Sequence, residues 1–319
     1  MATDEVTPIH LPLALVTEIQ RSGGSMAAQL FDGHPELFSH PFEIQIGHPR
    51  KWHWPELDLA GDAGLWFDRL FEAKLLHFVA KGYTKPGSNP YAQGEKHPFN
   101  FDPDRQRQVF LDRVRQRPPR SQRNILDAYF TAFFSAWSDF RSAGRERWIT
   151  GFTPRLLMVP RSIAGLRRDY PDGRIITLVR DPRSWWASAR RHAPREYGSL
   201  ADAMRLWSAS AEASLRIRLE DPERVYLTTY ERIVIDTETV MREIAAFLGI
   251  AFDPILLTPT FLRRPIQANS SFPVSGYGIN RGSLDRPDSL AGNERAVIEA
   301  MAMPAYARAD RLARGLAPA

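Results

Sequence analysis

Three short apolar runs stand out along the chain, and each precedes a segment whose apolar residues recur at helical spacing. The runs are LALVTEI (13–19), RIITLV (174–179) and RVYLTTY (224–230), and polar or turn-forming residues bound all three. Strands that alternate with helices pair in parallel and carry helices on both faces of the sheet. The pattern therefore predicts an α/β protein with a doubly wound parallel sheet, whose ligands bind at the carboxyl ends of the strands.

The segment 50–150 has a different pattern, dominated by helical periodicity. Residues 64–82 predict an amphipathic helix that ends at Gly82, and two further helices are expected at 104–117 and 125–140. We interpret 50–150 as a helical insertion after the first strand–helix unit. The many aromatic residues of 125–140 favour core packing, and the alternative is a pocket wall for an apolar or aromatic ligand.

Composition and charge narrow the class of protein. The 319 residues include no cysteine, which excludes disulfides, thiolate metal sites and a cysteine nucleophile. No apolar run approaches the length of a membrane span, and the acidic start does not resemble a signal peptide, so we expect a cytoplasmic protein. The net charge of +5 suggests an anionic partner. The densest basic cluster, 104–123, lacks a recognisable nucleic-acid module, and we interpret it as a solvated helix face.

A polar loop with two glycines, QRSGGSM (20–26), follows the first predicted strand and opens a helix. Gly23 and Gly24 permit close backbone approach to a ligand, and Ser25 supplies a hydroxyl group. Arg21 adds a guanidinium suited to oxyanions. The loop lacks the lysine of a Walker motif, which leaves open what kind of phosphate compound it holds.

A second candidate anion site follows the strand at 174–179, in RDPRSWWASARRH (180–192). Asp181 is a natural N-cap and Pro182 suits the first helical position. Arg180 and Arg183 are both expected to face the cleft. Two anion sites at one edge of the sheet predict a ligand with two separated phosphates. The alternative is a well-capped surface helix with ordinary arginines.

These motifs resemble those of the PAPS-dependent sulfotransferases, where PAPS is 3′-phosphoadenosine-5′-phosphosulfate. QRSGGSM is similar to the family's 5′-phosphosulfate loop, P-[KR]-S-G-T-[TS], and residues 180–188 are similar to its RDPRxxxxS motif. A further family segment resembles YERIVIDTETVMREIAAFLGIAFDP (230–254). The motif style is nearest to the branch of tyrosylprotein and bacterial sulfotransferases. The resemblance implies a P-loop-like sheet, PAPS as co-substrate, PAP as product and no metal.

The resemblance also assigns roles to single residues. Arg21 would stabilise charge on the leaving oxygen, and Arg180 with Ser188 would hold the 3′-phosphate. The 5′-phosphate would lie on the backbone of Ser22, Gly23, Gly24, Ser25 and Met26. Weaker matches nominate three more residues for the cofactor: Tyr230 near adenine, Ser270 at the 3′-phosphate and Arg286 in a covering loop.

The motifs leave two kinds of residue as candidates for the catalytic base, a glutamate and a histidine. Glu43 stands where the tyrosylprotein branch has a glutamate, and we favour it over His40, His48 and His53. His34 is interpreted as part of a turn beside a proline.

Two positions depart from the family. Gly24 replaces the usual threonine, and Phe152 replaces a lysine. These departures raise the question of whether the phosphate cradle and the acceptor contacts are complete.

We therefore expect a single sulfotransferase domain over 1–319. Its parts are a 5′-phosphosulfate unit (13–49), the insertion (about 50–150), a 3′-phosphate part with a covering loop (151–290) and a C-terminal helix (291–319). The expected acceptor is a small-molecule hydroxyl compound, apolar or phenolic, with carbohydrate and peptidyl tyrosine still open, and no nucleic acid. The alternatives are a P-loop kinase, disfavoured by the missing lysine, and a non-catalytic polyanion binder.

Overall fold

A computed structural model describes residues 7–47, 53–83 and 97–317. A five-stranded parallel sheet runs through the centre of the molecule with the order β2-β3-β1-β4-β5. The strands are β1 (Leu13–Thr17), β2 (Leu37–Glu43), β3 (Trp148–Phe152), β4 (Arg174–Val179) and β5 (Val225–Thr229). The predicted fold class is confirmed, and β1, β4 and β5 lie within the three predicted runs.

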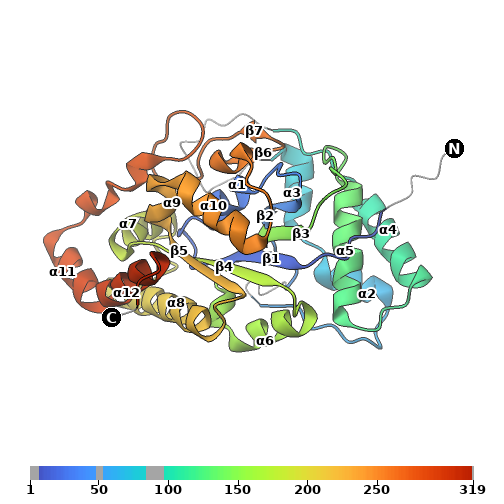
Figure 1. Ribbon diagram of the computed structural model, residues 1–319, viewed down its shortest axis with the longest axis horizontal. Coiled ribbons are helices and arrows are strands. Elements are labelled where there is room, and N and C mark those ends of the chain that lie inside the picture. Colours follow the sequence, from blue (N-terminus) through green and yellow to red (C-terminus); the bar gives the residue numbers. More distant parts are fainter. Residues whose placement is uncertain (1–6, 48–52, 84–96, 318–319) are drawn as a thin grey trace.

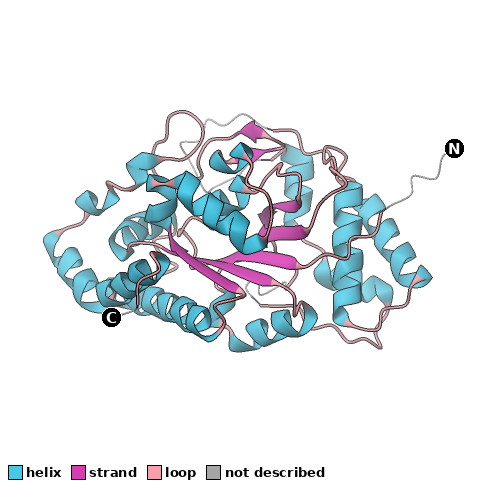
Figure 2. Ribbon diagram, in the orientation of Figure 1, coloured by secondary structure: helices cyan, strands magenta, loops and turns pink. Residues whose placement is uncertain are grey.

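Helices cover both faces of the sheet (Figures 1 and 2). They are α1 (Gly24–Leu30), α2 (Ala63–Leu70), α3 (Lys74–Lys81), α4 (Pro103–Gln116), α5 (Gln122–Ala136), α6 (Pro160–Asp169), α7 (Pro182–His192), α8 (Leu200–Glu220), α9 (Tyr230–Ile235), α10 (Thr237–Leu248), α11 (Gly292–Met301) and α12 (Met303–Ala313). A short antiparallel pair, β6 (Thr260–Phe261) and β7 (Arg264–Pro265), lies apart from the main sheet. None of the helices in the described ranges is both long and apolar enough to cross a membrane.

Alternation along β1 divides its side chains between the two faces. Leu13 and Leu15 pack into a core with the insertion helices, whereas Ala14 and Val16 pack with α1 and α10. A third core joins α7, α8, α11 and α12 at the β5 side. All of β1 is buried, as expected for a central parallel strand.

Helices α2 to α5 lie between β2 and β3 in the chain and gather beside the β2 edge of the sheet (Figure 1). The aromatic side chains of α5 pack in the core, with Phe130 and Phe133 fully buried, so the core interpretation of 125–140 is confirmed. The single helix predicted at 64–82 is instead two helices. The break lies at Glu72, whose buried carboxylate turns inward to accept hydrogen bonds from the Gln45 amide and to meet His40.

Candidate active site

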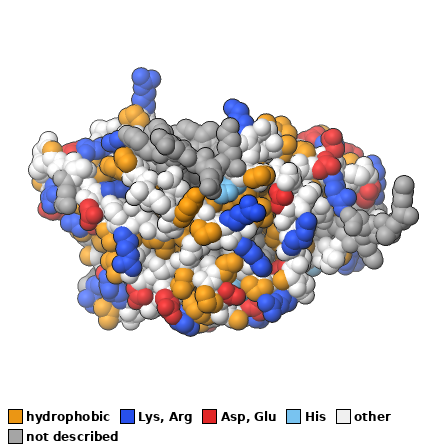
Figure 3. All heavy atoms as spheres, turned by 90° about the horizontal axis from the view of Figure 1, so that it is seen from above, with side chains coloured by type: hydrophobic (Ala, Val, Ile, Leu, Met, Phe, Trp, Pro, Cys, Tyr) orange, Lys and Arg blue, Asp and Glu red, His pale blue; other side chains and the backbone are white. Residues whose placement is uncertain are grey.

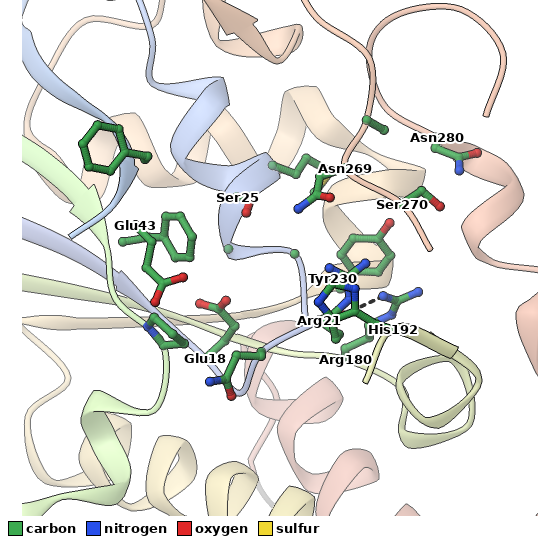
Figure 4. Close-up of a pocket in the computed structure, with 18 of the residues that line it drawn as sticks. Glu18, Arg21, Ser25, Glu43, Arg180, His192, Tyr230, Asn269, Ser270 and Asn280 are labelled. Carbon is green, nitrogen blue, oxygen red and sulfur yellow. Dashed lines mark hydrogen bonds between the residues drawn. The ribbon is translucent and has the colours of Figure 1, made fainter. Parts of the chain in front are cut away.

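A cavity of about 360 Å³ opens at the carboxyl ends of the parallel strands (Figure 4). Its walls come from the loop after β1, the ends of β2, β3 and β4, helix α3 and the segment 268–286. This is the edge of the sheet at which the sequence predicted a ligand. Segments far apart in the chain therefore meet at one site.

The loop after β1 is held in an unusual backbone conformation by its neighbours. Arg21 has φ 73° and Gly23 has φ 105°, and such values are uncommon for a residue with a side chain. The indole N–H of Trp185 donates to the carbonyl of Gln20 at 2.7 Å, and Arg180 Nη1 donates to the carbonyl of Arg21, also at 2.7 Å. The RDPR segment thus fixes the shape of the glycine loop as well as contributing its own side chains.

Gly23 lies directly against the ring of Tyr230. A Cβ atom at position 23 would come within 2.5 Å of that ring, so no other residue fits here. The Arg180 guanidinium lies 4.3 Å from the centre of the same ring, and the Tyr230 hydroxyl donates to Ser283 Oγ at 2.7 Å. Tyr230 therefore joins the loop, the guanidinium and the C-terminal segment in one packed unit.

Arg180 is the least satisfied cation of the site. It is 3% exposed, and its Nε and Nη2 atoms have no hydrogen-bond partner among the described residues. A nearby carboxyl group, Glu231, has its pKa raised to about 7 by burial and bonds to the Asp181 amide. Buried donors without acceptors carry a cost that an anionic ligand can remove.

Two further arginines lie in the same cavity as Arg180. Arg21 donates to Ser271 Oγ at 2.9 Å, and Arg286 donates to Ser270 Oγ at 2.9 Å. Burial and the charge of Arg180 lower the pKa of Arg21 to about 10 and that of Arg286 to about 9. Such depressed values mean that the cations repel one another and lack enough carboxylates to balance them.

The predicted cofactor residues occupy different depths around this cluster. Gly23, Gly24, Ser25, Met26, Arg21, Arg180, Tyr230, Ser270 and Arg286 line the cavity. Ser188 is fully buried, and its Oγ accepts a long hydrogen bond of 3.4 Å from Arg21 Nε. Ser22 is also fully buried, and its hydroxyl has no partner among the described residues.

Arg183 does not line the cavity, which corrects the expectation that both arginines of the RDPR motif face the cleft. Its guanidinium forms an ion pair with Asp181 at 2.5 Å. Asp181 also accepts a hydrogen bond from the Arg183 amide at 2.8 Å, which is the N-cap predicted for α7. Of the two arginines of the motif, Arg180 therefore lies in the site, and Arg183 stabilises the start of α7.

The other end of the cavity is formed by aromatic rings and carboxyl groups. Phe42, Phe78 and Phe152 line it, and the rings of Phe42 and Phe78 lie 4.9 Å apart. Glu43 ends β2 and points into this part of the cavity (Figure 4). Phe152, at the position where the resemblance led us to expect a lysine, therefore belongs to this apolar wall.

Glu18 is a cavity residue that sequence reasoning missed. It follows β1, is 4% exposed and lies with Glu43 at the same end of the cavity (Figure 4). Burial, with repulsion from Glu43, raises the pKa of Glu18 to about 8. The available signal was a carboxylate directly after an apolar strand, two residues before the loop.

The histidines considered as bases lie elsewhere. His40 is buried with its Nε2 3.2 Å from Glu72, and its Nδ1–H donates to the Phe42 carbonyl at 2.9 Å. His53 contacts Arg161, and neither histidine lines the cavity. His48 falls outside the described residues. His34 bonds to the Glu36 amide and the Ala251 carbonyl, as its turn interpretation requires. In the described part of the chain, no three His, Cys, Asp or Glu side chains gather as a metal site.

Comparison with solved structures shows the same fold in other proteins. The sulfotransferase domain from the curacin biosynthetic pathway is 17% identical with a TM-score of 0.51, and the match covers 91% of this chain and 97% of that one. The sulfotransferase domain from the Synechococcus PCC 7002 olefin synthase is 18% identical with a TM-score of 0.51, covering 90% and 96%. No curated protein sequence matches this chain.

A family model described as "Sulfotransferase family" matches residues 12–254, which is more than half of the chain. The matched range contains the glycine loop, the RDPR motif and Glu43. It ends before Ser270 and Arg286, which the fold brings to the same cavity. This chain belongs to the sulfotransferase family.

Proposed function

We propose that this sulfotransferase takes the sulfuryl group of PAPS and passes it to the hydroxyl group of an apolar or aromatic small molecule, leaving PAP and a sulfate ester. The observation that carries the proposal is the cluster of Arg21, Arg180 and Arg286 in one cavity. Arg180 and Arg286 are buried, and two nitrogen atoms of Arg180 have no hydrogen-bond partner among the described residues. A donor with two separated phosphates supplies the anionic oxygens that such a cluster lacks.

The residues of the cavity fit the two phosphates of the donor. Arg180, Arg286 and Ser270 would hold the 3′-phosphate, and the loop from Ser22 to Met26 would hold the 5′-phosphate. Arg21 belongs to that loop, yet its guanidinium contacts Ser188 and Ser271. It thus connects the two phosphate sites, a position suited to the charge that develops on the bridging oxygen.

Glu43 is the proposed base at the acceptor end. PAPS supplies a sulfur atom whose bond to the 5′-phosphate oxygen breaks as the acceptor oxygen attacks. The acceptor hydroxyl loses its proton in this step, and the Glu43 carboxylate receives it. Glu43 suits this role because it points into the cavity beside the aromatic wall rather than into the arginine cluster (Figure 4).

The acceptor class follows from the wall around Glu43. The rings of Phe42, Phe78 and Phe152 favour a flat apolar or phenolic compound over a sugar. On the face of the molecule shown in Figure 3, the basic side chains of the described residues are interspersed with acidic and apolar ones and form no continuous basic surface for a polyanion. We therefore favour a small-molecule acceptor over a polyanionic polymer.

The test is a transfer assay with sulfur-labelled PAPS over a panel of phenols, aliphatic alcohols, sugars and tyrosine peptides, combined with calorimetry of PAP binding. We expect saturable PAP binding and label transfer to phenols or alcohols. A protein that does not bind PAP, or that phosphorylates these acceptors with ATP and Mg²⁺, would contradict the proposal.

A further inference from the structure

The side chain of Glu18 fills the space beside Gly24. A Cβ atom at position 24 would lie 2.2 Å from Glu18 Oε1 and 2.4 Å from Oε2, so the carboxyl group occupies the place of a side chain at that position. Gly24 has no positive φ angle, so its backbone does not require glycine. The glycine is therefore explained by the carboxyl group of Glu18 and not by the turn.

Glu18 is polar, buried and only partly satisfied. One of its oxygens meets the amide of Gly24, whereas Oε2 has no hydrogen-bond partner among the described residues. The other titratable groups at this end of the cavity are Glu43 on β2 and Lys74 and His77 on α3, and Arg21 lies in the loop itself. An oxygen that is buried, unpaired and directed into a ligand cavity implies a partner on the ligand.

We propose that Glu18, in its protonated form, donates a hydrogen bond from its carboxylic acid to the 5′-phosphate end of the donor and so replaces the threonine hydroxyl that related loops carry at position 24. This inference rests on the proposed function, because it concerns the same donor. Glu18 keeps its proton throughout and takes no part in the transfer. It acts as a contact residue of the donor.

Burial favours the protonated form of Glu18, and so does the neighbouring carboxyl group of Glu43. An ionised carboxylate beside a phosphate would repel it, whereas a neutral acid offers one O–H donor. Glu43 already places a negative charge nearby, and two adjacent carboxyl groups do not both ionise readily. The pKa of about 8 for Glu18 agrees with a neutral acid at physiological pH.

Calorimetry with two ligands tests this contact. PAP carries both phosphates, whereas 3′-AMP lacks the 5′-phosphate. We expect Glu18→Ala to weaken PAP about tenfold and to leave 3′-AMP unchanged, and Glu18→Gln, which retains a neutral donor, to bind PAP like the wild type. Tighter PAP binding by Glu18→Ala would show an ionised, repelling carboxylate and would overturn the proposal, as would equal losses for both ligands.

A residue exchange tests the shared space directly. Gly24→Thr should clash with Glu18 and weaken PAP by about tenfold or more. The double variant Glu18→Ala with Gly24→Thr should recover PAP affinity, because the threonine hydroxyl then has room to take over the contact. Losses that simply add in the double variant would overturn the proposal. Circular dichroism of each variant separates a binding defect from a folding defect.

The pH dependence provides an independent measurement. Since the protonated acid binds, wild-type affinity for PAP should fall about tenfold per pH unit above pH 8. The PAP affinity of Glu18→Gln should not change with pH near pH 8. A fall in affinity above pH 8 that persists in Glu18→Gln would exclude Glu18 as its cause. Two outcomes separate this contact from the proposed function. A wild-type protein that does not bind PAP refutes the proposed function, whereas normal PAP binding by Glu18→Ala refutes this contact alone.

Discussion

At one end of the cavity lie three guanidinium groups, buried for Arg180 and Arg286 and half-buried for Arg21, whereas at the other end aromatic rings lie beside two carboxyl groups. The arginine end is unfavourable without a ligand, because Arg21 and Arg286 have pKa values lowered by burial and mutual repulsion. The aromatic end stabilises the fold even without a ligand, since Phe42 and Phe78 belong to the main core.

This difference indicates how each end recognises its ligand. The arginine end selects by charge, with hydrogen-bond donors placed before the ligand arrives. The aromatic end selects by shape and apolar contact, with Glu43 placed for one proton transfer. Substitutions at the two ends should therefore affect different measurements, donor affinity at one and turnover or acceptor KM at the other.

The largest effect is expected at the aromatic end, on turnover. Glu43→Gln should reduce kcat by about 10²- to 10⁴-fold, because the amide cannot accept the acceptor proton, while PAP affinity stays near that of the wild type. Steady-state kinetics with labelled PAPS and calorimetry with PAP measure both quantities. Turnover at the wild-type rate would remove Glu43 as the base.

The next largest effect should be on donor affinity at the arginine end. Arg180→Ala should weaken PAP binding by about 2–4 kcal/mol, because a charge-assisted contact is lost and the Arg21 carbonyl loses its donor. The matched control is Arg183→Ala, a neighbouring arginine that pairs with Asp181 outside the cavity. Similar losses in both variants would show that the site is held by general positive charge alone.

The arginine end was also the more predictable of the two from the sequence. Its loop and its RDPR segment each directly follow a strand, so local motifs placed Arg21 and Arg180 at the same edge of the sheet. Motifs cannot resolve orientation along a helix, which is why Arg183 was expected in the cleft and lies outside it. The roles assigned to Ser188 and Tyr230 toward the donor stay predictions.

The aromatic end depends on contacts between distant segments and was harder to predict. The strand β2 was not identified because His40 and Pro41 interrupt its apolar pattern, and the helix break at Glu72 depends on a bond to Gln45. Glu18 was not predicted as a site residue, because its proximity to Gly24 cannot be read from a local sequence pattern. The same geometry shows that a side chain at position 24 would meet the Glu18 carboxyl group.

A smaller effect should appear in donor affinity when the third arginine of the cavity is removed. Arg286 donates to Ser270 Oγ at 2.9 Å and lies in the same cavity as Arg180. Burial and the charge of Arg180 lower the pKa of Arg286, so an anionic ligand beside it relieves an unfavourable charge.

Arg286→Met should therefore weaken PAP binding by about tenfold and leave the pH dependence near pH 8 unchanged. Calorimetry of both proteins between pH 7 and pH 10 measures this. Wild-type PAP affinity in Arg286→Met would remove Arg286 from the donor site.

The smallest effect concerns the aromatic wall. Phe152→Leu keeps an apolar side chain but removes a ring, so KM for a phenolic acceptor should rise about two- to tenfold while PAP affinity is unchanged. Phe38→Leu is the control, because Phe38 is a β2 phenylalanine that pairs with Ile149 of β3 and does not line the cavity. A rise in KM in both variants would indicate a general loss of packing. A rise confined to Phe152→Leu, larger for phenols than for aliphatic alcohols, would show that the ring itself contacts the acceptor. Equal KM values in Phe152→Leu and the wild type would move acceptor recognition to Phe42 and Phe78.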